Sequence, residues 1–239
     1  LQQSLPYRNL GVSGRATYSY DSRYFLEANF GYNGSERFAK NYRFGFFPSI
    51  GTGWIISNEP YYSESLKEIM PKLKLKATYG LVGNDNIGGS ANRFFFLSEV
   101  DVFGSEFSYS KPSVAITRYE NPNITWEVAK KTNVGFEINL FNTLDFNADF
   151  FTEYRSKILL SRSYIPRTMG LWSTPQANLG EAEGKGVDFS IDYNKVFNQN
   201  WWLSGRVNFT YASSKFKKYE EPDYSATPWL SRINQKLSQ

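Results

Sequence analysis

A strict alternation of apolar and polar residues runs along residues 72–81, which read Lys-Leu-Lys-Leu-Lys-Ala-Thr-Tyr-Gly-Leu. Every second residue from Leu73 to Leu81 is apolar, whereas those between them as far as Thr78 are charged or polar. Because successive side chains on a β-strand point to opposite faces, this strand has one apolar and one polar face. The pattern recurs along the chain, with aromatic residues near the strand ends, which is typical of an outer-membrane β-barrel wall.

Eight segments with this alternation are predicted to be strands. The turns after the first, fifth and seventh are short, and the link between the third and fourth is moderate. Longer connections follow the second, fourth, sixth and eighth. Short and long connections that alternate in this way indicate an antiparallel up-and-down barrel with tight periplasmic turns and long outer loops. The predicted strands are Leu10–Tyr20, Tyr24–Tyr32, Phe44–Ser57, Lys72–Leu81, Ile124–Leu140, Leu144–Tyr154, Ala177–Tyr193 and Trp201–Tyr211.

Composition agrees with a barrel and not with a helical membrane protein. Aromatic residues make up 18% of the 239 residues, yet the mean hydropathy is −0.49. The chain contains no apolar run of about 18 residues, the length that a transmembrane helix needs. In a barrel wall, lipid-facing apolar residues are diluted by polar residues that face the lumen.

The absence of two residue types excludes several function classes. The chain has no cysteine and no histidine, so thiol chemistry and Ser-His-Asp or Cys-His arrangements are excluded, and we expect no enzyme activity. The net charge is only +4, and no basic run interleaves with aromatic residues, so we expect no nucleic-acid partner. Asp85 lies among asparagines, but one carboxylate is too few for a calcium site. We expect no metal and no cofactor.

The faces of the later strands and the long loops can also be assigned. In the fifth strand, Trp126, Val128 and Val134 are predicted to face outward. A helix of one or two turns is predicted within 63–70, before Pro71. The segments 83–123 and 156–176 are predicted to be long loops. The charged residues predicted to face the lumen are Glu127, Glu137, Asp145, Asp149, Glu153 and Arg155.

Several stretches of the sequence resemble the SusC/RagA family of TonB-dependent outer-membrane transporters from Bacteroidetes. Five blocks occur in the order that the family shows, and they extend across about Tyr7 to Tyr193. One departure is Lys185 directly after Gly184, where the family usually has Asn before Lys-Gly. The blocks are Tyr24–Phe38, Phe47–Trp54 with Glu59, Leu73–Asn84, Asn121–Glu127 with Asn133–Glu137, and Asn178–Asp188.

This resemblance implies a 22-stranded barrel whose lumen is closed by an N-terminal plug. It also implies a SusD/RagB-like surface lipoprotein as a lid, and energy supplied by TonB through an N-terminal region. Each strand needs about 9–11 residues to cross the bilayer, so 22 strands do not fit into 239 residues. The sequence shows no plug-like region, and it lacks a terminal aromatic residue. We therefore expect residues 1–239 to be about eight strands from the middle to late part of one transmembrane β-barrel domain.

The function implied is import of a large nutrient, an oligosaccharide or a peptide, across the bacterial outer membrane. This segment would supply barrel wall and extracellular loops. Aromatic rings stack on sugar rings or apolar side chains, and arginine pairs with carboxylates, so the loop residues of these types are candidate ligand contacts. The alternative is that they pack the loops against one another or against the lid. The candidates are Arg93, Phe94, Phe95, Phe96, Tyr109 and Trp172.

Two other functions are consistent with eight strands. A complete small barrel could serve as an adhesin or a structural anchor, since eight strands suffice to close a barrel. An eight-stranded outer-membrane enzyme would need a nucleophile and a base at its rim, and the lack of histidine argues against it. The family blocks favour the transporter.

Overall fold

The computed structural model describes residues 8–87, 93–103 and 113–237. Its main element is an eight-stranded antiparallel sheet with the order β1-β2-β3-β4-β7-β8-β9-β10, and a separate hairpin pairs β5 with β6. The strands are β1 Asn9–Tyr20, β2 Tyr24–Ser35, β3 Phe44–Ile55, β4 Lys72–Asn84, β5 Glu99–Phe103, β6 Ser113–Arg118, β7 Glu127–Leu140, β8 Leu144–Ser161, β9 Gln176–Asn198 and β10 Trp201–Lys218; the helix α1 spans Glu64–Ile69, and short 3-10 turns span Lys40–Tyr42, Ile56–Asn58, Arg167–Met169 and Pro228–Leu230.

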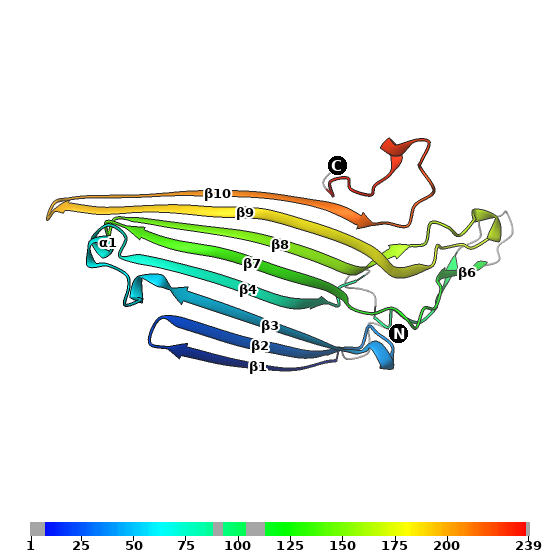
Figure 1. Ribbon diagram of the computed structural model, residues 1–239. Coiled ribbons are helices and arrows are strands. Elements are labelled where there is room, and N and C mark those ends of the chain that lie inside the picture. Colours follow the sequence, from blue (N-terminus) through cyan, green and yellow to red (C-terminus); the bar gives the residue numbers. More distant parts are fainter. Residues whose placement is uncertain (1–7, 88–92, 104–112, 238–239) are drawn as a thin grey trace.

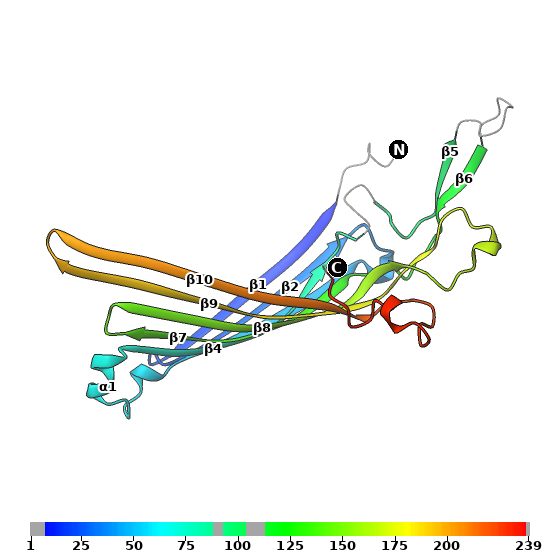
Figure 2. The ribbon, with the colours of Figure 1, turned by 90° about the horizontal axis from the view of Figure 1, so that it is seen from above.

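Each strand of the main sheet pairs with the next one along the chain, apart from the hairpin inserted between β4 and β7. All short turns and α1 lie at one end of the sheet, whereas the long connections lie at the other (Figure 1). We call these the turn end and the loop end. β1 and β2 cross β9 and β10 at a steep angle, and β5–β6 projects beyond the loop end (Figure 2). The predicted alternation of short and long connections is confirmed.

All eight predicted strands are present, with differences in their bounds. The fifth begins at Glu127 and not at Ile124, and the last three extend well beyond their predicted ends, to Ser161, Asn198 and Lys218. The segment 83–123, predicted to be a loop, contains the β5–β6 hairpin. The consecutive phenylalanines just before that hairpin, Phe94 to Phe96, have no period of two, and this hid the short strands that follow. The predicted helix is confirmed as α1, where Ser63 caps the N-terminus by accepting from Leu66 N.

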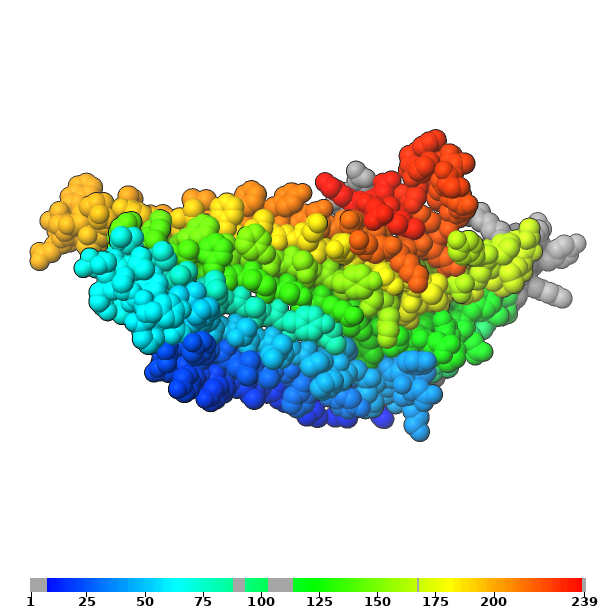
Figure 3. Space-filling view, in the orientation of Figure 1, coloured from blue at the N-terminus to red at the C-terminus, as the bar shows by residue number. Residues whose placement is uncertain are grey.

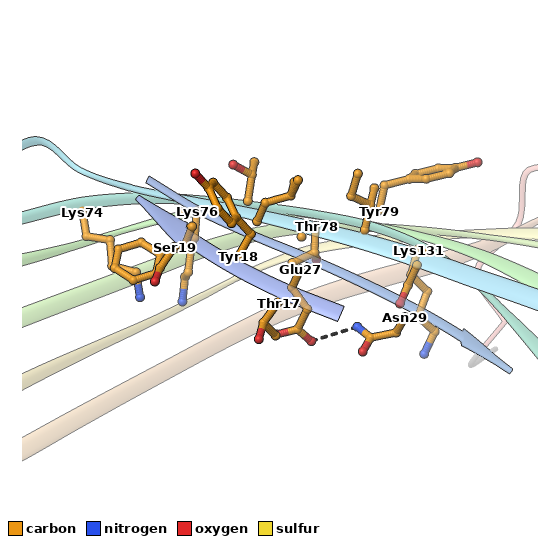
Figure 4. Close-up of a pocket in the computed structure, with 18 of the residues that line it drawn as sticks. Thr17, Tyr18, Ser19, Glu27, Asn29, Lys74, Lys76, Thr78, Tyr79 and Lys131 are labelled. Carbon is orange, nitrogen blue, oxygen red and sulfur yellow. Dashed lines mark hydrogen bonds between the residues drawn. The ribbon is translucent and has the colours of Figure 1, made fainter. Parts of the chain in front are cut away.

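The sheet has the two-faced character that the sequence predicts. Val134 on β7 is 52% exposed and Phe209 on β10 is 47% exposed, although both are large apolar side chains. Tyr18 and Tyr79 point to one side of the sheet, whereas Lys74 and Lys76 point to the other (Figure 4). We call these the apolar face and the polar face. None of the helices in the described part of the chain has the length and apolar character needed to cross a bilayer.

Irregularities in the strands occur where the sequence contains proline or glycine. Pro48 pairs with Phe30 of β2, but the β3–β4 pairing begins only at Ser49. β3 is thus a local edge at Pro48, which is where a strand tolerates proline. The β8–β9 register shifts opposite Gly180, where Lys157 has a φ of 59°. This shift is a β-bulge in the β8–β9 pair.

The chain after β10 folds back on the loop end of that strand. Isolated bridges join Lys215 to Lys236 and Phe216 to Ile233. In the space-filling view the strands follow one another from β1 to β10, and the C-terminal segment gathers over the loop end of β10 (Figure 3). β1 and β10 are the two edges, so the sheet does not close on itself in the described part of the chain.

One buried carboxylate, that of Glu59, connects neighbouring turns at the turn end of the sheet. Glu59, in the link between β3 and α1, is 5% exposed and pairs with Arg23 of the β1–β2 turn at 3.0 Å. Its Oε1 accepts a hydrogen bond from Trp54 Nε1 at 2.8 Å. Hydrogen bonds from the hydroxyl of Tyr24 and from this indole hold the pKa of Glu59 below its usual value. Glu59 therefore joins two consecutive turns through its charged form.

Acid is expected to weaken this corner. A carboxyl whose pKa is lowered by folding stabilises the protein above its unfolded pKa of about 4.3, and this stabilisation is lost as the pH falls towards the lowered value. The unfolding temperature of wild type should therefore exceed that of Glu59→Gln at about pH 6, and the gap should narrow below about pH 4. A gap that stays constant down to about pH 3 would show that the charge of Glu59 contributes nothing.

Candidate functional site

The polar face carries a network of paired charges over β4, β7 and β8. Glu137 lies among three lysines of β4 and accepts from Lys72 Nζ at 2.8 Å and Lys74 Nζ at 3.3 Å. Lys76 reaches across to Asp149 of β8 at 2.9 Å. The strand registers place all six charged residues predicted to face the lumen on this one face. The polar face is thus a charged surface with most of its charges neutralised locally.

A hollow of about 830 Å³ lies against β1 to β4. Gly51 and Gly53 line it without side chains, which leaves room above the middle of β3. Lys74, Lys76 and Lys131 extend on the polar side of the sheet beside it (Figure 4). Of these, Lys131 has only a long contact with Glu153, at 3.9 Å. The hollow can therefore accept polar or anionic groups.

A compact hydrophobic cluster, which we call the loop core, lies at the loop end. It joins residues from the β2–β3 loop, the β4–β5 segment and the approach to β7. The ring of Phe38 packs at 5.2 Å from that of Trp126, and the ring of Phe47 of β3 packs edge to face with Trp126, also at 5.2 Å. Three connections that are far apart in the sequence are thereby held as one unit. Its buried members are Phe38, Ile87, Phe95, Ile124 and Trp126.

Polar contacts fix the same loops around this core. Arg37 donates from Nη1 to the backbone oxygen of Asp85 at 3.1 Å and accepts at its own backbone oxygen from Phe95 N at 3.1 Å. Asn178 of β9 exchanges two hydrogen bonds of 3.0 Å with the backbone of Thr125. Asn121 donates to the backbone of Gln176 at 2.8 Å. Arg37, Asn121, Thr125 and Asn178 belong to the sequence blocks on which the family resemblance was based.

The structure places three of the predicted ligand contacts around the loop core. Arg93 pairs with Glu36 at 2.6 Å, and both side chains are only about a tenth exposed. Phe94, which has a φ of 49°, and Phe96 pack edge to face at 6.5 Å and are both partly exposed. The Arg93 guanidinium lies 5.3 Å from the Phe94 ring. Arg93 is therefore held mainly by protein contacts, while the two rings keep some exposed surface.

The other three candidates lie in different environments. Phe95 is 2% exposed inside the loop core, with the Arg118 guanidinium 4.9 Å from its ring. Trp172, in the β8–β9 loop, is 58% exposed. Tyr109 lies outside the described residues. The structure thus brings Arg93 to Phe96 together as one run, and a binding role for the six residues stays a prediction.

The predicted outward orientation of Trp126 is wrong. Its side chain is 7% exposed and lies in the loop core, and Nε1 donates to the backbone oxygen of Arg43 at 3.3 Å. The physical reason is that the chain before Glu127 is a turn and not a strand, so the alternation does not extend to this residue. Loops from β2 and β4 then cover the indole. Val134, further along the same strand, is exposed on the apolar face as predicted.

Residues 36–38 build much of the site, although none of them is among the predicted ligand contacts. Glu36, Arg37 and Phe38 are all nearly or fully buried, at 9%, 6% and 0% exposed. The sequence holds only a weak signal of this burial, the run Glu-Arg-Phe in a short loop. Charged residues are rarely buried unless they are paired, so the run alone does not predict a buried position. Among the described residues, no group of three or more acidic side chains is arranged to hold a metal ion.

Comparison with known proteins relates this architecture to a family. The model of the TonB dependent receptor-like β-barrel matches residues 2–234. TonB-dependent receptor P3 of Formosa agariphila is 31% identical over 215 residues, which are 90% of this chain and 21% of that protein. TonB-dependent receptor SusC of Bacteroides thetaiotaomicron is 26% identical over 223 residues, 91% of this chain and 22% of SusC. The chain spans about a fifth of the length of these relatives.

Solved structures show the same fold. A chain of the RagAB peptide importer in its closed-closed state superimposes with a TM-score of 0.74 at 24% identity, over 89% of this chain and 22% of that chain. The outer membrane transporter YddB from Escherichia coli gives a TM-score of 0.61 at 12% identity, over 87% of this chain and 24% of that chain. The matched family is one of receptors and transporters and not of enzymes. The chain belongs to the TonB-dependent receptor-like β-barrel family, whose SusC-like and RagA-like members lie in the bacterial outer membrane.

Proposed function

We propose that the protein containing this chain imports a large nutrient, an oligosaccharide or a peptide, across the outer membrane. The observation that carries the proposal is the two-faced sheet with all its long connections at one end. Its apolar face suits lipid, its polar face suits a water-filled lumen, and its ordered loops form an outer mouth. Relatives at up to 31% identity carry the name TonB-dependent receptor, and RagAB is titled a peptide importer.

The transporter that we propose contains further strands and a plug beyond the residues of this chain. β1 and β10 expose unpaired edges in the described part of the chain, and a sheet edge of this length pairs with further strands in stable proteins. We infer that residues 1–239 are part of one larger barrel, for which the family resemblance implies 22 strands and a plug. This open arrangement disfavours a complete eight-stranded adhesin or anchor. A SusD/RagB-like lipoprotein covers the loop end, and TonB supplies energy from the inner membrane.

The transport proposal is tested in cells that carry the full-length gene. Uptake of labelled oligosaccharides and of labelled peptides is measured in wild type, in a deletion of this gene and in a deletion of the gene for TonB. We expect uptake of one ligand class to be lost in both deletions. Uptake that persists at the wild-type rate for both classes in either deletion would contradict the proposal.

The loop aromatics are tested separately by ligand affinity. In the full-length transporter, Phe94, Phe96 and Trp172 are each replaced by alanine, alone and together. A ring that stacks on a ligand contributes about 0.5–1.5 kcal/mol, so the triple variant should bind at least about tenfold more weakly. Tyr61→Ala is the matched control, because this tyrosine is 68% exposed but lies at the turn end. Unchanged affinity in a folded triple variant would reject these rings as ligand contacts.

A further inference from the structure

A second hollow, of about 480 Å³, lies at the loop end beside β1, β2 and β3. Leu10, Gly34 and Phe44 line it and are direct cross-strand neighbours on these three strands. The hollow therefore lies over the surface of these three strands. Leu10 is 62% and Phe44 is 43% exposed, and both belong to the apolar face.

The charge lining this hollow is strongly unbalanced. Its charged residues are Arg8, Arg43, Arg93 and Glu36. Glu36 is already engaged by Arg93, at 2.6 Å between Nη2 and Oε1. Neither Arg8 nor Arg43 forms an ion pair within the described part of the chain. Two positive charges therefore remain without a counter-charge beside an apolar surface.

Arg43 is held in place by its backbone. Its carbonyl oxygen accepts from Ser35 N at 3.0 Å and from Trp126 Nε1 at 3.3 Å, so its position is tied to β2 and to the loop core. Its Nε is buried and has no hydrogen-bond partner. A guanidinium binds phosphate through two parallel hydrogen bonds. The backbone of Arg43 is therefore fixed beside the hollow, and its guanidinium is a candidate donor to an anion.

The level of the hollow in the membrane indicates which anion would bind there. The ring of Phe44 stacks on that of Tyr32 at 5.2 Å on the apolar face, and Phe94 also lines the hollow. Aromatic rings of this kind lie at the level of the lipid headgroups. We propose that the hollow binds the phosphate of an outer-leaflet lipid headgroup, with Arg8 and Arg43 as its donors and Arg93 held beside it by Glu36.

Lipid retention tests the proposal. The full-length transporter is reconstituted in phosphatidylcholine nanodiscs that contain either diphosphorylated lipid A or the same lipid without its phosphates, and bound lipid is counted by native mass spectrometry. We expect wild type to retain the phosphorylated lipid at least about tenfold more than the dephosphorylated one. The double variant Arg8→Gln with Arg43→Gln should lose this preference. Lys40→Gln is the control, because this exposed lysine lies in the same loop but does not line the hollow.

Inorganic phosphate distinguishes the source of the anion and needs no variant. If the hollow recognises a lipid phosphate, high phosphate concentrations should displace lipid A from wild type and leave the dephosphorylated lipid unaffected. Equal retention of the two lipids by wild type, or equal retention of lipid A by wild type and the folded double variant, overturns the proposal. If inorganic phosphate binds at Arg8 and Arg43 but lipid A is not retained, the hollow is a site for free phosphate and the lipid proposal is overturned.

Discussion

A Val134→Arg variant is expected not to assemble in the outer membrane. Val134 lies midway along β7, is 52% exposed on the apolar face, and pairs with Ala77 on one side and Phe150 on the other. An arginine facing lipid near the middle of the bilayer costs about 2–4 kcal/mol, roughly a 30- to 700-fold shift against the folded barrel. Heat-modifiable migration of the full-length protein from isolated outer membranes measures the assembled fraction, which should fall steeply.

The neighbouring residue supplies the matched control. Asn133 precedes Val134 on the same strand and pairs with Thr78, so its side chain lies on the polar face. Asn133→Arg adds the same charge at the same depth but in contact with water, and it should leave the assembled fraction close to that of wild type. Equal loss in the two variants would mean that the two faces are not solvated differently, and the barrel interpretation would fail.

Phe95→Ala is expected to open the loop core and to destabilise it by about 3–5 kcal/mol, the usual cost of removing a buried phenylalanine side chain. Phe95 is 2% exposed and packs in the loop core with residues of three connections. The loss should appear as faster proteolytic cleavage and faster amide exchange in residues 36–38 and 121–126, while the strands below stay protected.

The adjacent ring makes this prediction specific. Phe94 is partly exposed and is not a member of the loop core, so Phe94→Ala should leave exchange in those loops within about twofold of wild type. If Phe95→Ala leaves loop protection unchanged and lowers only ligand affinity, then Phe95 is a binding residue and not a packing residue. The two measurements thus separate the two roles considered for the phenylalanine run.

The strands could be predicted from the sequence because each alternates over many residues. The period of two in 72–81 is set by one physical condition, water on one side and lipid on the other, and it needs no knowledge of distant residues. The alternation does not predict the environment of Trp126. Its position in the count matches the apolar face, but loops that follow β2 and β4 cover it, and nothing local in the sequence records that contact.

The site was less predictable for the same reason. Glu36 and Arg93 are 57 residues apart, and their pairing depends on how two loops fold over the end of the sheet. Aromatic and arginine residues in long loops identified the correct region around residues 93–96. They did not distinguish the buried ring of Phe95 from the partly exposed rings beside it, because burial there is decided by Phe38 and Ile124.

The shared core beneath the outer mouth has a consequence for molecular recognition. Loops that are already ordered lose little conformational entropy when a solute lands on them, so more of the contact energy remains as affinity. The same coupling means that a shift of one loop is transmitted to the others through Phe38, Phe95 and Trp126. If these loops contact the ligand as proposed, a change in ligand preference requires either concerted repacking of three connections or alteration of the β8–β9 loop alone, whose Trp172 lies outside this core.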